Sequence, residues 1–118
     1  MASATFALIA LFALQLPSSG PGCIAAVTAV PTGAVFSGQT VTFADGTLVN
    51  PLTRFLSRSW TFGDGSSVTS TQSAQLTATH AYVNRTGHTI ALTARLSERT
   101  GLGSCTTTYA VTISPISI

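Results

Sequence analysis

From residue 22 onward, apolar and polar side chains alternate in short runs separated by turn residues. Alternation with a period of two is typical of β-strands that bury one face. The runs that show it are 24–30, 39–44, 54–62, 75–82, 89–96 and 105–113. Asp45-Gly46 and Asp64-Gly65 are turn signals between such runs. Because helical periodicity and internal repeats are absent from this region, the pattern predicts an all-β sandwich of about seven strands.

The alternation also predicts which side chains share a face. In the run 54–62, Arg58 lies on the same face as Trp60 and Phe62, together with Leu56. In the run 75–82, the corresponding face contains Leu76, Ala78, His80 and Tyr82. These faces are predicted to pack between the two sheets.

The N-terminal segment has a different character. Residues 2–16 contain no charge and are followed by a Pro- and Gly-rich break at 17–22. The run is short for a bilayer, which needs about 20 apolar residues, so no stable membrane span is predicted. It suits either the apolar region of a cleaved secretory signal or a retained segment buried in an assembly. A lipid anchor on Cys23 is a third alternative, and all three place the protein outside the cytoplasm.

The sequence is therefore divided into an apolar segment, 1–22, and a folded domain, 23–118. If the segment is retained, its large apolar side chains would contact a neighbouring copy. These assembly residues are Phe6, Leu8, Ile9, Leu11, Phe12, Leu14 and Leu16. The two cysteines, Cys23 and Cys105, predict one disulfide in an exported chain, with two buried thiols as the alternative.

Composition limits the function. Charged residues make up 7% of the chain, and the five cations are all Arg and scattered, which argues against nucleic-acid binding. Ser and Thr supply 34 of the 118 residues. Such a surface must be kept soluble by hydroxyls, covered by glycans or buried against other subunits. Asn84-Arg85-Thr86 is an N-glycosylation sequon in a predicted exposed turn, so Asn84 is a candidate glycan acceptor.

Candidate chemistry is sparse. His80, Asp64 and one of the many Ser could form a triad, but a hydrogen-bonded core histidine is the favoured interpretation. Asp45, Asp64 and Glu98 fall in separate turns or strand ends, so paired-carboxylate catalysis is not expected. A calcium site usually needs two or more carboxylates, and Asp64 is better explained as a turn-former. No catalytic residue, metal or cofactor is predicted.

Three motifs support a family resemblance. They are Trp60-Thr61-Phe62-Gly63-Asp64-Gly65, Thr79-His80-Ala81-Tyr82 and Gly87-His88-Thr89-Ile90-Ala91-Leu92. In this order the sequence resembles the PKD family of immunoglobulin-like extracellular β-sandwiches. The resemblance implies a core motif formed by Trp60, Phe62, Gly63, Asp64, Gly65, His80, Tyr82 and Gly87. It also implies a non-catalytic module that mediates protein or carbohydrate contacts.

Two function hypotheses remain. The leading one is a structural subunit at the cell surface or outside the cell, a homo-oligomer that polymerises into a filament or sheath through the apolar segment. The alternative is a secreted module that binds glycan or protein after the segment has been cleaved. The state of the mature N-terminus distinguishes the two.

Overall fold

A computed structural model describes residues 22–116, so the predicted assembly residues of the segment 1–22 lie outside the described part. Residues 22–116 form strands and no helix, so this part of the chain contains no membrane-spanning helix. The ten strands of this part are β2 (Cys23–Ile24), β3 (Val27–Val30), β4 (Ala34–Phe36), β5 (Thr40–Asp45), β6 (Leu48–Val49), β7 (Phe55–Thr61), β8 (Ser67–Ser70), β9 (Thr77–Ala81), β10 (Ile90–Thr100) and β11 (Gly103–Ser114).

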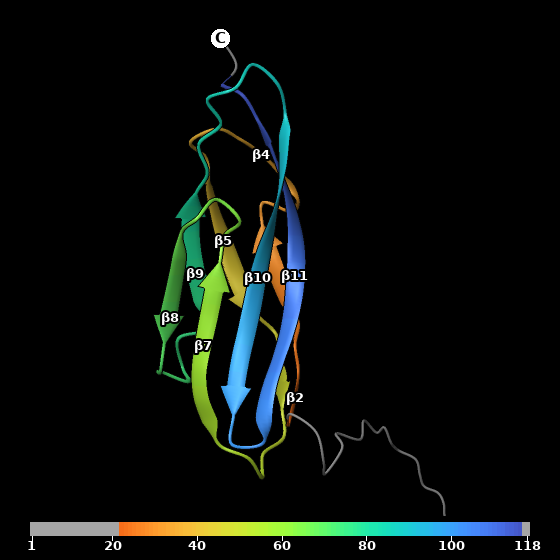
Figure 1. Ribbon diagram of the computed structural model, residues 1–118, viewed down its shortest axis with the longest axis vertical. Helices are drawn as coiled ribbons and strands as arrows, with labels where there is room; N and C mark the ends of the chain where they lie inside the picture. The colour runs from red at the N-terminus through yellow and green to blue at the C-terminus, as the bar shows by residue number, and fades with distance from the viewer. Residues whose placement is uncertain (1–21, 117–118) are drawn as a thin grey trace, which may run out of the picture.

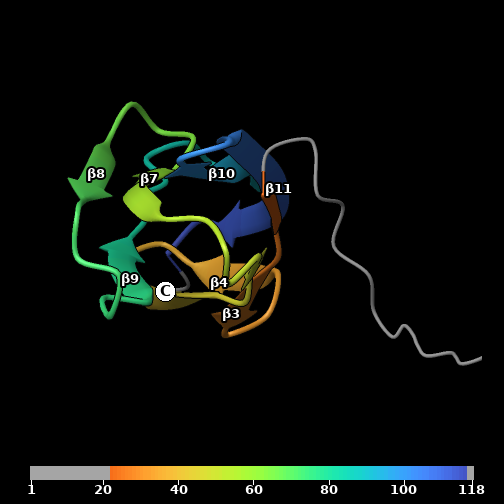
Figure 2. The ribbon, with the colours of Figure 1, turned by 90° about the horizontal axis from the view of Figure 1, so that it is seen from below.

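The strands form two layers. A five-stranded sheet in the order β4-β11-β10-β7-β8 faces a three-stranded sheet in the order β3-β5-β9 (Figures 1 and 2). A separate pair, β2 and β6, adds a short antiparallel ladder. The all-β, immunoglobulin-like sandwich predicted from the alternation is confirmed.

The strand count differs from the predicted seven because short strands occur where the sequence shows turn residues. The predicted run 24–30 is divided into β2 and β3, and the chain then changes sheets at Pro31. Beyond this proline, β4 pairs in parallel with β11 in the other sheet. The strand β8 contains only Ser, Val and Thr, which made it look like part of a loop, yet it pairs with β7 over four residues.

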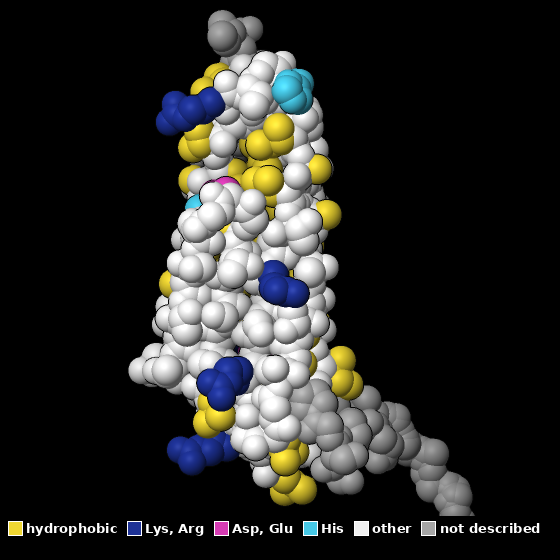
Figure 3. All heavy atoms as spheres, in the orientation of Figure 1, with side chains coloured by type: hydrophobic (Ala, Val, Ile, Leu, Met, Phe, Trp, Pro, Cys, Tyr) yellow, Lys and Arg dark blue, Asp and Glu magenta, His cyan; other side chains and the backbone are white. Residues whose placement is uncertain are grey.

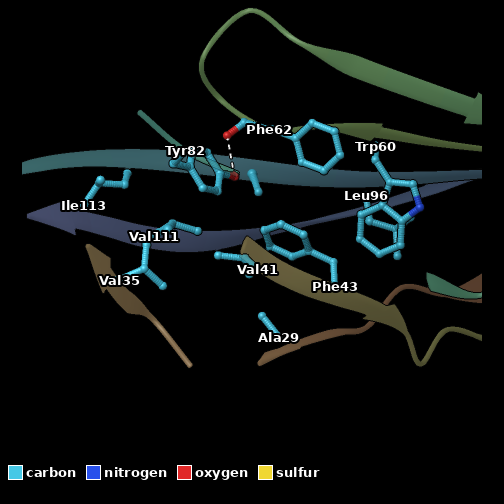
Figure 4. Packing of buried hydrophobic residues seen from close by; sticks show 11 residues of the cluster. Ala29, Val35, Val41, Phe43, Trp60, Phe62, Tyr82, Leu96, Val111 and Ile113 are labelled. Atoms are coloured by element: carbon cyan, nitrogen blue, oxygen red, sulfur yellow. Dashed lines mark hydrogen bonds between the residues drawn. The ribbon is translucent and has the colours of Figure 1, made fainter. Parts of the chain in front are cut away.

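The core lies between the layers and is centred on Phe43 of β5 (Figure 4). The Phe43 ring contacts Trp60 and Phe62 of the opposite layer at centroid distances of 5.8 and 5.7 Å. The predicted inward positions of Trp60 and Phe62 are therefore correct. Leu76 is an exception, because it precedes β9 and its side chain is 48% exposed.

Cys23 and Cys105 form a disulfide, with their Cα atoms 6.0 Å apart. The bond joins β2, near the start of the described chain, to the long strand β11. The strand that pairs in parallel with β11 is β4, whereas β2 itself pairs with β6. The disulfide therefore attaches a two-residue strand directly to the five-stranded sheet.

Candidate functional site

The turn after β7 contains the motif that carried the family resemblance. Gly63 has φ near +90°, and a Cβ there would lie 2.6 Å from the Thr93 carbonyl oxygen, so only glycine fits. Gly65 also has a positive φ. The turn closes with a hydrogen bond from the Phe62 N–H to the Ser66 carbonyl oxygen (3.1 Å).

Tyr82 attaches this turn to the core. Its hydroxyl donates a hydrogen bond to the Phe62 carbonyl oxygen (2.8 Å), drawn as the dashed line in Figure 4. Burial, and to a lesser degree the charge of Asp64, raises the pKa of Tyr82 to about 12, so the hydroxyl keeps its proton. This arrangement resembles a tyrosine corner. Gly87, in contrast, has neither a positive φ nor a close neighbour, and nothing in the structure explains its choice.

His80 lies at the margin of the core, with 18% of its side chain exposed. Its ring stacks on Phe62 with centroids 4.3 Å apart and meets the Tyr82 ring in a T-shaped arrangement. Its Nε2 atom lies 2.6 Å from Asp64 Oδ2 and 3.2 Å from Ser66 Oγ. The expected core histidine is thus satisfied, but at the edge of the core and by turn residues.

These three residues do not have the geometry of a nucleophilic triad. In such a triad the acid and the serine bind opposite nitrogens of the imidazole. Here Asp64 and Ser66 both approach Nε2, and the Ser66 hydroxyl also donates to Asp64. Burial raises the pKa of Asp64, but hydrogen bonds from Ser66 and His80 outweigh it and lower the pKa to about 2. Asp64 is therefore an ionised acceptor that fixes the turn.

A second polar cluster surrounds Arg58, whose side chain is 2% exposed. Arg58 Nε donates to Asp45 Oδ2 and to Glu98 Oε1, the latter at 3.2 Å. The sequence placed these two acids apart, but strand pairing brings them together, because Glu98 is the register partner of Arg58 and β5 faces them. The expectation that Asp45 and Glu98 lie at separate places in the fold was therefore wrong.

The same guanidinium also holds a loop. Its terminal nitrogens donate to the carbonyl oxygens of Gln72, Ser73 and Gln75, in the connection between β8 and β9. The Phe55 ring lies beside the guanidinium, 4.8 Å from Cζ to the centroid. Arg58 therefore cross-links the sheets to this loop.

The two acids of the cluster differ in their protonation. Burial raises the pKa of Glu98 to about 7, and the hydrogen bond to Asp45 and the charge of Asp45 add to this effect. Burial also opposes ionisation of Asp45, but hydrogen bonds from Glu98, Thr47 and Arg58 lower its pKa overall. Below neutral pH, protonated Glu98 therefore donates to ionised Asp45, which is paired with Arg58.

This assignment predicts a pH dependence of stability. The folded state holds the Glu98 proton more tightly than the unfolded chain, whose pKa lies near 4.5. The stabilisation is therefore complete below pH 4.5 and is lost as the pH rises to about 7, by about 3 kcal/mol. In Glu98→Gln the amide can still donate to Asp45, so the decline in this interval should disappear. Urea denaturation at pH 4.5, 6 and 8 measures it, and parallel profiles for both proteins would contradict the assignment.

Asn84 is buried, with 4% of its surface exposed, which corrects the prediction of an exposed sequon. Its Nδ2 group donates to the carbonyl oxygens of His88 (2.9 Å) and Ile113 (2.8 Å). Its Oδ1 atom accepts from the backbone N–H of Thr86 (2.9 Å) and from the Thr86 hydroxyl. A glycan replaces one hydrogen of Nδ2, so it would break one of these two donor bonds, and in the folded domain Asn84 is a structural residue.

A groove lies between β8 and β9, which are edge strands of the two different sheets. Its volume is about 370 Å³. The residues that line it carry no charge: Trp60, Phe62, Val68, Thr69, Ser70, Gln75, Thr77, Ala78 and Thr79. The Arg58-bound loop contributes Gln75, and the turn that Asp64 fixes begins beyond Phe62. Sequence reasoning missed the groove because β8 was not identified as a strand.

The described residues contain no group of three His, Cys, Asp or Glu side chains that could hold a metal ion. The candidate site is the uncharged groove, which lies between the turn that Asp64 fixes and the loop that Arg58 holds.

Comparison with protein families decides the classification. A family model for the PKD domain matches residues 25–113. The chain belongs to the PKD domain family. A search of curated proteins found no match. PKD domains are typically non-catalytic structural or binding modules of extracellular or cell-surface proteins. In this PKD domain the Trp60–Gly65 turn, His80 and Tyr82 lie together.

Proposed function

We propose that this PKD domain is a non-catalytic structural subunit that self-assembles outside the cell into a filament or sheath through its apolar segment, residues 2–16. The observation that carries the proposal is the segment itself. Fifteen residues without a charge, rich in Leu and Phe, are stable in water only when they are buried. The core of the domain is already formed by buried side chains that lie between Ala29 and Ile113 in the sequence.

The surface of the domain supports a role in assembly. Asp45 and Glu98 are buried with Arg58, which leaves Asp64 as the one acid with a partly exposed side chain. Figure 3 shows a face covered mostly by uncharged atoms with a few widely separated Arg side chains, and apolar side chains are exposed at both ends of the domain. Because the exposed charges are few and widely separated, large uncharged areas of this surface can pack against an identical copy without burying a charge.

Assembly of the full chain tests the proposal. Electron microscopy and light scattering should show fibres when residues 2–16 are present. Replacing Leu8, Phe12 and Leu14 by Ser should leave monomers, because the buried apolar area is lost. Replacing the same three residues by Met is the matched control and should preserve assembly. Wild-type protein that stays monomeric at all concentrations would refute the proposal.

N-terminal sequencing of native material provides an independent test. A mature chain that begins at or before residue 6 keeps the segment and agrees with self-assembly. A mature start near Pro21 or Cys23 would mean that the segment is a cleaved signal. The domain would then be a secreted module that binds glycan or protein.

A further inference from the structure

We infer that the groove between β8 and β9 is the acceptor for the apolar segment of a neighbouring copy, which enters it as an added β-strand. The inference rests on the proposed self-assembly and identifies the surface that receives the segment.

Both walls of the groove are free strand edges. The strand β8 pairs only with β7, and β9 pairs only with β5, so each has one edge without a partner strand among the described residues. Natural sheets usually protect such edges with charged residues or proline. The sequences of β8, Ser-Val-Thr-Ser, and β9, Thr-Ala-Thr-His-Ala, contain neither Lys, Arg, Asp, Glu nor Pro. Their backbone groups are therefore open to an incoming strand.

The lining of the groove matches the segment in chemistry. Trp60 and Phe62 lie at its base, and Val68, with 45% of its surface exposed, lies on the β8 wall. Neither the groove nor the segment 2–16 contains a charge that would have to be desolvated. As a strand, the segment places Phe6, Leu8, Ala10, Phe12, Leu14 and Leu16 on one face. That face suits an apolar base, while the backbone pairs with the edges.

The position of the groove favours a segment from another copy. Figure 2 shows β8 and β9 on one side of the sandwich and β11, where the described chain enters, on the opposite side. The segment of the same chain would have to pass around the domain, and only residues 17–21 separate it from Gly22. Five residues span at most about 18 Å. A segment that leaves one copy and fills the groove of the next forms a head-to-tail contact that does not close, and so yields a fibre.

Charge introduced into the groove tests the inference in the full-length chain. Val68→Asp should raise the protein concentration needed for assembly at least tenfold, because an added strand would bury the carboxylate. Val30→Asp is the matched control, since Val30 lies on β3, away from the groove, and is 71% exposed. It should assemble as the wild type does. Near-ultraviolet circular dichroism checks that both variants are folded.

A second pair of variants keeps the test independent of any folding defect at Val68. Thr79→Lys places a cation on the β9 wall, and Thr108→Lys places one on an exposed position of β11. Only the former should impair assembly. In addition, amide hydrogen exchange at 67–70 and 77–81 should slow in wild-type fibres relative to the monomeric Leu8, Phe12 and Leu14 variant.

The outcomes separate this inference from the proposed function. Wild-type fibres together with normal assembly of both groove variants would overturn the groove as acceptor and leave self-assembly intact. Unchanged hydrogen exchange in β8 and β9 on assembly would also overturn it. If the wild-type chain does not assemble at all, the proposed function fails, and this inference fails with it.

Discussion

Replacing Arg58 by Met is expected to lower the free energy of unfolding by about 3–5 kcal/mol at pH 7, the range found when one partner of a buried ion pair is removed. The variant leaves the Asp45 carboxylate buried without its cation. It also leaves the carbonyl oxygens of Gln72, Ser73 and Gln75 without their donor. Met fills most of the volume, so the loss is chiefly electrostatic. Urea denaturation followed by Trp60 fluorescence measures it.

The loss of stability from Arg58→Met should become smaller toward pH 4. At that pH, protonation of Asp45 in the variant removes the buried negative charge that has lost its cation. Arg95→Met is the matched control, since Arg95 is exposed on β10 and its removal should change stability by no more than about 0.5 kcal/mol. A loss below 1 kcal/mol for Arg58→Met would show that the cluster contributes little to stability. The hydrogen bonds from Arg58 would then not be what holds the loop between β8 and β9 at the end of the groove.

Removal of the disulfide should have an effect of similar size. The double variant Cys23→Ser and Cys105→Ser should lose about 4 kcal/mol, because the bond closes a loop with a sequence separation of 82 residues in the unfolded chain. The two-residue ladder between β2 and β6 provides little to hold residues 22–24 in place once the bond is gone. Guanidinium denaturation of the oxidised and variant proteins measures the difference.

Chemical reduction provides the control for this prediction. Wild-type protein with its disulfide reduced should have the same midpoint of denaturation as the double Ser variant, since both release the same loop. A variant that loses less than 1 kcal/mol would contradict the chain-entropy argument. A large difference between the reduced and Ser proteins would mean that the substitutions disturb the packing of Cys23, which is itself buried.

Much of the fold could be predicted from local sequence. The period of two placed Trp60, Phe62 and Tyr82 in the core, because a strand with one buried face leaves no other pattern. The Gly-Asp-Gly turn was also readable, since Gly63 and Gly65 adopt positive φ. The strand β8 could not be recognised, because four Ser, Val and Thr residues at an exposed edge carry no strong hydrophobic signal.

The polar clusters were harder to predict, because they depend on strand register. Arg58 and Glu98 are 40 positions apart and meet only through the pairing of β7 with β10. The burial of Asn84 likewise depends on the end of β11, which supplies the Ile113 carbonyl oxygen. A sequon has the same letters whether its amide is in solvent or inside a hydrogen-bond network. Only the three-dimensional arrangement distinguishes the two.

The disulfide has a further consequence when the polypeptide is pulled at its two ends. Mechanical load applied at Gly22 enters Cys23 and crosses the covalent bond to Cys105 without passing through the intervening chain. Residues 24–104, which hold most of the core, are thereby shielded from traction between the two ends of the polypeptide. Under pulling, extension of this module is restricted to the short stretches outside the bonded pair.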